Sequence, residues 1–240
     1  MSTKVKAIFF DAGETLIHRN PSLLKITEKY LKKNKIKFNP KKLEQAMIKV
    51  AAQMSTIVKK GKMTDSDKWE LYMRNVFKEM KISKELLLQE IKKRLQKGTS
   101  FRRYTDVIPV VKYLKAKGIT TGVISNAPSH LWDMLKRAGI LNLFEHIIIS
   151  EETGYEKPHR QIFEAALKKA KVKSSEFVYV GDNYLADIVG ARQMGMIPVW
   201  IVRKTAHAHF SYRHAHKGER VRTISGLKGL LEMLKKEKLI

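Results

Sequence analysis

The sequence predicts an α/β protein, in which a parallel sheet is covered by helices on both faces and a helical segment is inserted after the first strand. Three observations support this prediction. The run from Lys4 to Phe10 is typical of a β-strand and ends at the turn residues Asp11-Ala12-Gly13. From about Asn20 to Lys97, apolar residues recur at helical spacing. After residue 103, helical and strand patterns alternate, as they do in the βαβ units of a Rossmann-like sheet.

The first strand must pair within the later sheet, because a lone strand beside a helical bundle would leave its backbone groups without hydrogen bonds. The predicted α/β core domain is therefore discontinuous and consists of residues 1–16 and 101–240. Residues 17–100 form the inserted four-helix domain.

Four helices are expected in the inserted segment. Asn20 and Asn39 are each followed by proline, which is typical of an N-cap ahead of the first helical position. Thr64 and Asp67 resemble a capping box, and Ser83 opens the last helix. The apolar stripes predicted to form the bundle core are Leu23, Ile26, Tyr30 and Leu31; Leu43, Met47, Val50, Met54 and Ile57; Trp69, Tyr72, Met73, Val76 and Phe77; and Leu87, Ile91 and Leu95.

The second part of the core domain is predicted to alternate helices and strands. The helices run from Val107 to Lys117 and onward from Pro128, His159 and Tyr184, and the strands are Ile119–Ile124, His146–Ile149, Phe177–Val180 and Ile197–Val202. The polar, histidine-rich stretch from Arg203 to Arg220 is predicted to be a loop.

The composition excludes several classes of protein. The chain of 240 residues is 43% hydrophobic, which is typical of a globular protein and not of a charged disordered chain. It has no cysteine, which excludes disulfides and thiolate zinc sites. No apolar run is long enough for a membrane span, and the run from Val5 to Phe10 is too short for a signal peptide. We therefore expect a cytoplasmic protein without a membrane partner.

The charge is strongly positive, with 48 Lys and Arg against 23 Asp and Glu and a net charge of +25. The excess is spread along the chain, because residues 17–100 hold 22 basic and 8 acidic side chains and residues 101–240 hold 24 and 13. Thirty-six of the basic residues are lysine, whereas bidentate phosphate recognition favours arginine. The pattern favours a solvated surface that attracts a small anionic substrate over a dedicated nucleic-acid site. The sequence predicts no oligomeric state.

Polar residues follow the predicted strands where each strand ends. Asp11-Ala-Gly13-Glu14-Thr15 follows the first strand, and Ser125-Asn126 follows the next one. Lys157-Pro158 lies in the following unit, and Gly181-Asp182-Asn183, with Asp187 beyond, follows the fourth strand. Ligands of open α/β sheets bind at these strand ends. Three carboxylates in one crevice would repel one another unless a cation joins them, and a site with oxygen ligands alone suits Mg²⁺.

These residues together fit phosphoryl transfer. The hydroxyl of Ser125 and nearby backbone N–H groups could hold phosphate oxygens, and Lys157 would neutralise the nucleophile and the charge of the transferred group. Asp11 is placed to attack phosphorus and form an aspartyl phosphate, which water then hydrolyses.

The sequence resembles the haloacid dehalogenase superfamily over essentially the whole chain. Asp11 to Thr15 resembles the first motif of that superfamily, Val123-Ile-Ser125-Asn126 the second, Glu156-Lys157-Pro158 the third, and Gly181-Asp182 with Asp187 the fourth. The resemblance implies a type 1 helical cap at residues 17–100 and a Mg²⁺-dependent phosphatase. It implies that Asp11, Asp182, Asp187 and the carbonyl of Gly13 bind the metal, that Asp11, Lys157 and Ser125 are catalytic, and that Thr15, Ser125, Asn126 and Lys157 bind substrate.

The sequence departs from the phosphatase pattern at Gly13, where the family normally has an aspartate that acts as general acid. Such an acid typically contributes about 10²- to 10⁴-fold to the rate. One reading is a slow or leaving-group-selective phosphatase, with Glu14 or His18 as a replacement acid. A second is a 2-haloacid dehalogenase, because halide leaves without a proton, although the Asp182 and Asp187 pair has no purpose there.

Two further readings remain open at this point. A phosphonate hydrolase would need a cap lysine as Schiff base, and the sequence does not single one out. A weakly catalytic scaffold would bind nucleic acid or another acidic partner through the basic cap. The loop with His207, His209, His214 and His216 is expected to be plain surface, and its basic residues Arg203, Lys204, Arg213, Lys217 and Arg220 mark the place in the core where nucleic acid would bind. The phosphatase reading leads, because Ser125, Lys157 and the acidic pair all suit a phosphoryl group with Mg²⁺.

Overall fold

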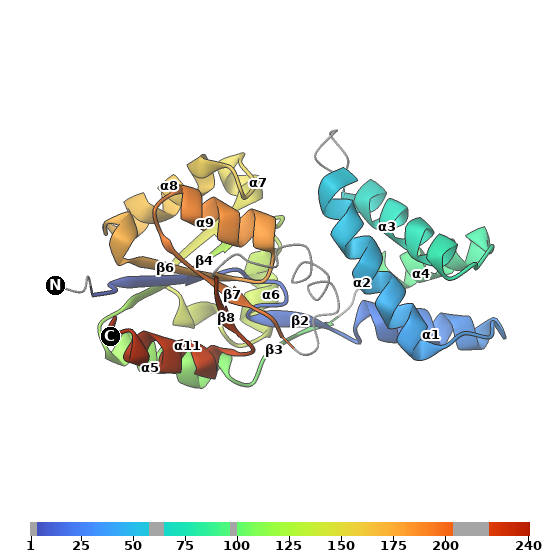
Figure 1. Cartoon of the computed structure of the whole chain (residues 1–240), viewed down its shortest axis with the longest axis horizontal. Coiled ribbons are helices and arrows are strands. Elements are labelled where there is room, and N and C mark those ends of the chain that lie inside the picture. The colour runs from blue at the N-terminus through green and yellow to red at the C-terminus, as the bar shows by residue number, and fades with distance from the viewer. Residues whose placement is uncertain (1–3, 58–64, 97–99, 204–220) are drawn as a thin grey trace. The chain divides into compact units, whose positions relative to one another are not determined.

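The chain forms two compact units, each with its own hydrophobic core. The structure, a computed structural model, describes residues 4–57, 65–96, 100–203 and 221–240 (Figure 1). Among these residues, the core unit comprises residues 4–18, 101–203 and 221–240, and the helical unit comprises residues 19–57, 65–96 and 100.

The core unit contains a six-stranded sheet with the order β5-β4-β1-β6-β7-β8, in which every pair of neighbours is parallel. The strands are β1 (Ala7–Phe10), β4 (Thr120–Ser125), β5 (His146–Ile149), β6 (Phe177–Gly181), β7 (Ile197–Ile201) and β8 (Arg222–Ile224). The chain builds outward from β1 to β5 and then returns to the other side of β1 with β6. The strand order therefore reverses beside β1, which is where open α/β sheets bind ligands. The predicted α/β, Rossmann-like fold is confirmed.

Helices cover both faces of the sheet. Successive side chains of a strand point to opposite faces, and every residue of β1 is buried, so both faces must be covered. Ile8 and Phe10 pack with α5 (Val107–Ala116), α6 (Leu131–Arg137) and α11 (Leu227–Lys236). Ala7 and Phe9 pack with α8 (Arg160–Ala170) and α9 (Gly190–Gln193). Figure 1 shows α5 and α11 on one side of the sheet and α8 and α9 on the other. The short helix α7 (Ser150–Thr153) follows β5.

The helical unit contains α1 (Leu23–Lys33), α2 (Pro40–Ile57), α3 (Asp65–Glu79) and α4 (Glu85–Gln96). Its core is built from the predicted stripes, with Leu31, Leu43, Met73 and Ile91 fully buried. The N-cap at Asn39 is confirmed, because its Oδ1 accepts a hydrogen bond of 3.1 Å from the backbone N of Lys42. The N-cap predicted at Asn20 is wrong, since the hydroxyl of Ser22 caps α1 instead. Thr64 lies outside the described residues.

Besides the short helix α7, four elements were not predicted from the sequence pattern. The strands β2 (Ile17–Asn20) and β3 (Ser100–Arg103) pair with each other in a separate two-stranded sheet. They stand where the chain passes from the core unit to the helical unit and back. The strand β8 and the helix α11 complete the core unit after the loop predicted at residues 203–220.

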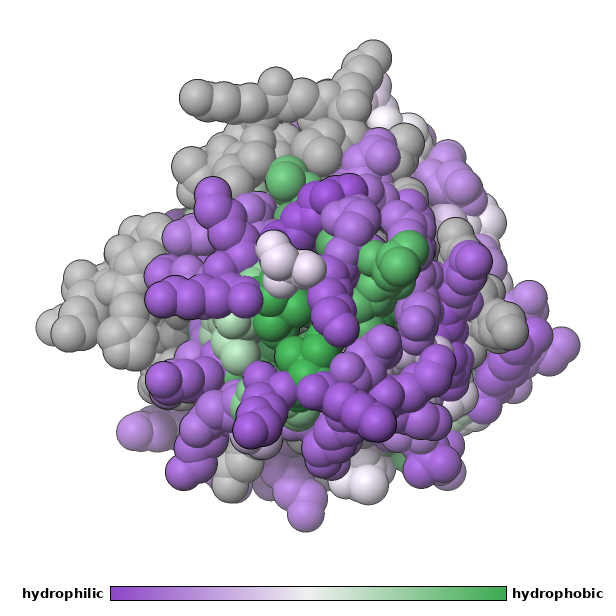
Figure 2. All heavy atoms as spheres, turned by 90° about the vertical axis from the view of Figure 1, so that its right-hand side faces the viewer, coloured by the Kyte–Doolittle hydropathy of each residue, from purple (hydrophilic) through white to green (hydrophobic). Residues whose placement is uncertain are grey.

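Few charged side chains in the described part of the chain are buried, namely Asp11, Lys157, Asp182, Asp187 and Arg203. On the face drawn in Figure 2, hydrophilic residues surround a small hydrophobic area. No helix in the described part of the chain is both long enough and apolar enough to cross a membrane.

Candidate active site

The first strand sets the position of Asp11. Phe10 is in register with Val123 of β4 and with Val180 of β6, so the carboxyl ends of these three strands lie side by side. The backbone N of Asp11 donates to the carbonyl of Val180 at 2.8 Å, which extends the β1–β6 ladder by one residue. Asp11 is thereby held at the middle of the sheet edge where the strand order reverses.

Three carboxylates meet at this edge. One side-chain oxygen from each of Asp11, Asp182 and Asp187 lies within 4.8 Å of the others, and all three residues are buried. Asp187 belongs to a π-helical turn, Tyr184–Val189, and its Oδ2 accepts a 2.8 Å hydrogen bond from the backbone N of Asn183. The last residue of β6 must be small, because a Cβ on Gly181 would overlap the Asp187 carboxylate.

The ammonium group of Lys157 joins the cluster. Lys157 is only 5% exposed, and its Nζ donates to Asp11 Oδ1 and Asp187 Oδ1, both at 2.7 Å. The same nitrogen lies 3.0 Å from the Ile124 carbonyl and 2.8 Å from the Tyr179 hydroxyl. A lysine buried to this extent requires partners of opposite charge, and it has two.

The carboxylates of the cluster outnumber its single ammonium group. The pKa of Asp11 is raised to about 8, mainly by burial and also by the charges of Asp187 and Asp182, against the lowering effect of Lys157. Burial also raises the pKa of Asp187, against the lowering effect of Lys157. Burial alone would lower the pKa of Lys157, but the charges of Asp11 and Asp187 raise it above its ordinary value. One lysine therefore does not neutralise three carboxylates, and the oxygen cluster fits a divalent cation in charge and in ligand type.

Asn126 fixes the backbone of Lys157. Its Nδ2 donates to the Lys157 carbonyl at 3.0 Å, and its Oδ1 accepts from the Lys157 N at 2.7 Å. Both ends of the amide are thus engaged, which makes Asn126 a support for Lys157 in this structure. Ser125 is buried at the end of β4, directly after Ile124, whose carbonyl accepts from Lys157.

Thr15, Gly13 and Glu14 lie in the turn after β1. Thr15 is fully buried, and among the described residues its hydroxyl has no hydrogen-bond partner. Gly13 is exposed, and a Cβ built on it would meet no atom within 4 Å. The Glu14 carboxylate accepts a 2.8 Å hydrogen bond from the Tyr104 hydroxyl, and the His18 ring packs 4.7 Å from the Tyr104 ring. Both replacement acids considered for Gly13 therefore contact the same tyrosine.

Tyr179 is a site residue that the sequence did not indicate. Its hydroxyl donates to the Ile124 carbonyl at 2.8 Å and lies 3.3 Å from Asp187 Oδ1. Burial and then the charge of Asp187 raise its pKa well above the ordinary value, so it remains a neutral donor. In the sequence it stands within the apolar run of β6, where an aromatic residue is expected in the core.

Arg203 was predicted in a basic surface loop, and this prediction is wrong. Arg203 is only 6% exposed and is paired with Asp106. A guanidinium buried in the core unit is unavailable to nucleic acid. The four histidines of the predicted loop, and Lys204, Arg213, Lys217 and Arg220, lie outside the described residues.

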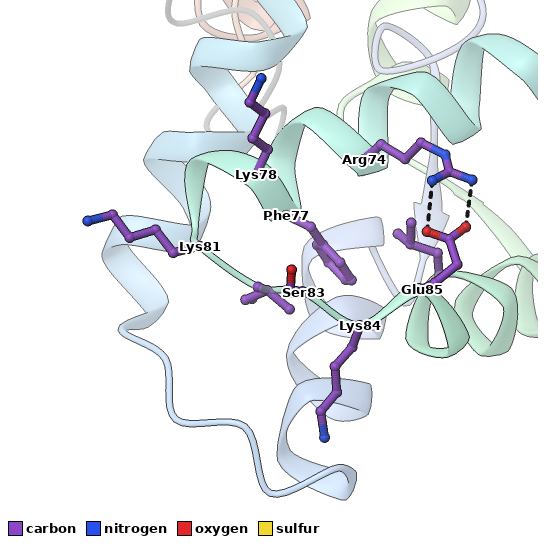
Figure 3. A pocket seen from close by; sticks show the side chains of 9 residues that line it. Arg74, Phe77, Lys78, Lys81, Ser83, Lys84 and Glu85 are labelled. Atoms are coloured by element: carbon purple, nitrogen blue, oxygen red, sulfur yellow. Dashed lines mark hydrogen bonds and ion pairs between the residues drawn. The ribbon is translucent and has the colours of Figure 1, made fainter.

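Two surface hollows contain none of the predicted site residues. One, of about 580 Å³, lies at the turn between α3 and α4, with Phe77 and Leu88 among its lining residues. Figure 3 shows that Lys78, Lys81 and Lys84 point in different directions from this turn. These charges do not converge as they would in an anion site. The other, of about 430 Å³, belongs to the core unit and is lined by Phe101, Arg102, Arg103, Thr105, Ile108, Arg137 and Ala138.

Several curated proteins are similar in sequence. The chain is 34% identical over 142 residues to the glyceraldehyde 3-phosphate phosphatase of Pyrococcus furiosus, covering 59% of this chain and 58% of that protein. It is 42% identical over 101 residues to the protein of the same name from Methanopyrus kandleri, covering 42% of this chain and 43% of that protein. The match thus spans about half the length of these two relatives. Haloacid dehalogenase-like hydrolase domain-containing protein 3 of Danio rerio is 26% identical over 215 residues, covering 85% of this chain and 88% of that protein.

Solved structures share the fold. A HAD family hydrolase from Deinococcus radiodurans, with bound phosphate and sodium, has a TM-score of 0.73 and 16% identity, covering 99% of this chain and 98% of that chain. The HAD-hydrolase YfnB from Bacillus subtilis, bound to magnesium, has a TM-score of 0.69 and 18% identity, covering 97% of this chain and 100% of that chain. The family model described as haloacid dehalogenase-like hydrolase matches residues 8–202, a range that includes every predicted site residue. The chain therefore belongs to the haloacid dehalogenase-like hydrolase family.

Proposed function

We propose that the protein is a Mg²⁺-dependent phosphatase that acts on a small phosphorylated substrate through an aspartyl phosphate on Asp11. The observation that carries this proposal is the buried cluster in which Lys157 contacts Asp11 and Asp187 beside Asp182, at the carboxyl ends of the strands. The names of the curated relatives support a phosphorylated substrate of the size of a triose phosphate.

Asp11 is the nucleophile in this proposal. Lys157 holds Oδ1 of Asp11, which orients the other carboxylate oxygen for attack on phosphorus. As the new oxygen–phosphorus bond forms, the bond from phosphorus to the leaving oxygen breaks, and that oxygen takes the electron pair. A water molecule then attacks the phosphorus of the aspartyl phosphate, which releases inorganic phosphate and restores the Asp11 carboxylate. Ser125 and Thr15 are proposed to donate hydrogen bonds to the phosphoryl oxygens.

Mg²⁺ would be held by Asp11, Asp182, Asp187 and the carbonyl of Gly13. When bound, the ion supplies positive charge that offsets the charge of the phosphoryl oxygens. The chain's own residues prepare that position, because Asn183 and Gly181 fix Asp187, and Trp200 Nε1 donates to the Asp182 carbonyl at 2.8 Å.

The helical unit is proposed to act as the cap that selects the substrate, and the lysine-rich surface to attract anions. The phosphonate alternative needs a lysine of the cap as Schiff base, and burial is what lowers the pKa of such a lysine. Among the helical-unit residues whose burial the structure describes, no lysine is buried. This observation disfavours a Schiff-base mechanism.

The proposal is tested by a panel of phosphate esters assayed with and without Mg²⁺. We expect turnover of an activated aryl or acyl phosphate that requires Mg²⁺ and stops when EDTA is added. A wild-type protein that is inactive on such substrates with saturating Mg²⁺ would contradict the phosphatase assignment. Halide release from a 2-haloacid without metal would instead identify a dehalogenase.

Mg²⁺ is expected to raise the melting temperature more at pH 8 than at pH 5. The pKa of Asp11 is raised from 3.8 to about 8, so without metal the folded chain holds this proton more tightly than the unfolded chain. That stability is fully present near pH 4 and is lost as the pH rises toward 8. Mg²⁺ competes with the proton and therefore gains affinity over the same range. Calorimetry at the two pH values measures the difference, and equal shifts would contradict a metal at Asp11.

The variant Gly13→Asp is expected to raise turnover of alkyl phosphates by about 10²-fold, because it supplies the acid that protonates the leaving oxygen. The new side chain has room, since no atom lies within 4 Å of a Cβ at this position. The matched control is Gly13→Asn, which is similar in size but supplies no carboxylic acid. If both variants change turnover equally, or if neither does, the absence of an acid at position 13 is not what limits the turnover of alkyl phosphates.

A further inference from the structure

Arg203 connects the end of the sheet to the turn that follows Asp11. It lies just beyond β7, and its Nη2 donates to the carbonyl of Thr15 at 2.7 Å. Its Nη1 donates to Asp106 Oδ2 at 2.6 Å. The guanidinium carbon also lies 4.0 Å from the centre of the Tyr104 ring, which is a cation–π distance.

The turn is held from outside at three consecutive residues. Tyr104 donates from its hydroxyl to Glu14 at 2.8 Å and from its backbone N to the Leu16 carbonyl at 3.0 Å. Between these two residues, the Thr15 carbonyl accepts the hydrogen bond from Arg203. Inside the turn, the backbone N groups of Leu16 and Ile17 both donate to the Ala12 carbonyl, at 2.9 and 3.0 Å. Asp11 immediately precedes Ala12, so the position of the turn sets the position of the carboxylate.

Arg203 is itself fixed from the C-terminal side. Asp106 Oδ2 accepts a second hydrogen bond, of 2.8 Å, from the backbone N of Leu227 at the start of α11. A Cβ built on Gly226 would lie 3.0 Å from that oxygen and 3.4 Å from Arg203 Nη1, which is tighter than ordinary contact. The guanidinium is therefore clamped between Tyr104, Asp106 and the backbone of residues 226 and 227.

The same group of residues carries a cost in stability. Of the four buried side-chain polar atoms without a partner among the described residues, three are here: Thr15 Oγ1, Asp106 Oδ1 and Arg203 Nε. A buried polar atom without a hydrogen bond lowers stability, because it has lost its bond to water and gained none in return. Buried ion pairs are in general weak sources of stability. A charged pair retained under these conditions is better explained by what it positions than by what it adds to the stability of the core.

We propose that Arg203 is a positioning residue for the reaction, which acts by holding the turn from Ala12 to Ile17 and, through it, the Asp11 carboxylate. This inference rests on the proposed phosphatase function for its kinetic part. Its structural part, the restraint of the turn, can be measured whether or not the protein is a phosphatase.

The test compares Arg203→Met with Arg222→Met. Arg222 is also in the core unit and pairs with a carboxylate, Glu237, and among the described residues it has no hydrogen bond or ion pair with the turn. For Arg203→Met we expect kcat to fall by about 10²-fold, as misplacement of a reacting group by an ångström does. We expect KM to change by less than about threefold, because the residue does not touch substrate. Arg222→Met should leave both constants unchanged.

Hydrogen exchange supplies the readout that is independent of activity. In Arg203→Met, the backbone amides of residues 12–17 should exchange at least about tenfold faster, while those of β4 keep their protection. General destabilisation would speed exchange in both segments, and this result would overturn the proposal. Unchanged exchange in the turn would overturn it as well. If the wild type has no phosphatase activity but exchange in the turn is accelerated, the proposed function fails and the positioning role of Arg203 stands.

Two milder variants keep the test decisive if Arg203→Met does not fold. Arg203→Lys keeps the charge but replaces the planar fork by a single ammonium group, which cannot serve Thr15 and Asp106 in the same geometry. For Arg203→Lys we expect a kcat, and an amide exchange rate in residues 12–17, between those of the wild type and of Arg203→Met. Tyr104→Phe removes only the hydrogen bond to Glu14, so its effect should be smaller than that of Arg203→Lys. The reverse order would contradict the proposal.

Discussion

Replacement of Asp11 by asparagine is expected to lower kcat for an activated aryl phosphate by roughly 10⁴- to 10⁶-fold, the range found when a catalytic nucleophile is removed. The amide is nearly the same size but is too weak a nucleophile to attack phosphorus. Lys157 keeps three further acceptors in this variant, namely Asp187, Tyr179 and the Ile124 carbonyl, so the cluster should remain assembled. Steady-state kinetics at saturating Mg²⁺ measure the loss, and acid quenching should trap a phosphoenzyme only in the wild type.

The control for this experiment is Glu232→Gln, which makes the same carboxylate-to-amide change at an exposed position of α11. It should retain full activity. An Asp11→Asn variant that is folded by circular dichroism and still turns over at a rate near the wild type would exclude Asp11 as the nucleophile. The reaction would then have to use a water molecule directly.

Replacement of Lys157 by methionine is expected to lower the free energy of unfolding by about 3–5 kcal/mol, the cost of removing one partner from a buried ion pair. Methionine has a similar length but no charge, and it would remove the ammonium group that pairs with the buried carboxylates of Asp11 and Asp187. The raised pKa of Lys157 has the same meaning, because a group that holds its proton more tightly when folded stabilises the fold below its unfolded pKa. Urea denaturation at pH 7 measures the loss.

Mg²⁺ separates the structural role of Lys157 from its proposed catalytic role. In Lys157→Met, the added ion should restore part of the stability, because it supplies positive charge to the same carboxylates, whereas kcat should stay low. The control is Lys168→Met, at an exposed position of α8, which should change stability by less than about 0.5 kcal/mol. An unfolding midpoint for Lys157→Met that matches the wild type would show that the ion pairs of Lys157 do not stabilise the fold.

The arrangement of the main site residues could be predicted from the sequence because the sheet is parallel. In a parallel sheet every strand ends at the same edge, so Asp11, Asp182 and Lys157 could be brought together from the order of the strands without knowledge of any distance. The supporting residues could not be found in this way. Tyr179 lies inside an apolar run, and Arg203 is followed by polar residues that suggest a loop. Their roles depend on contacts with residues far away in the chain.

The fold was predicted best where the periodicity is long. The four helices of the helical unit follow from apolar stripes of two or more turns, whereas β2, β3 and β8 have only three or four residues each and carry no distinct pattern. The partner of β2 lies about 80 residues away, at β3, so no local turn marks the pair. The prediction of an N-cap at Asn20 was wrong for a related reason. Asn20 is the last residue of β2, and Ser22, two residues later, caps α1 instead.

The central place of β1 has a consequence for the order in which the protein is assembled. Both neighbours of β1 lie far along the chain, since β4 begins at Thr120 and β6 ends at Gly181. During synthesis, β1 leaves the ribosome before both of its partner strands and cannot complete its hydrogen bonds until some 170 further residues have followed. The helical unit has a shorter delay, because its described residues all lie between Arg19 and Ser100. Although β1 is made before its partner strands, it therefore completes its pairing late. Contacts between residues so far apart in the sequence form slowly during folding.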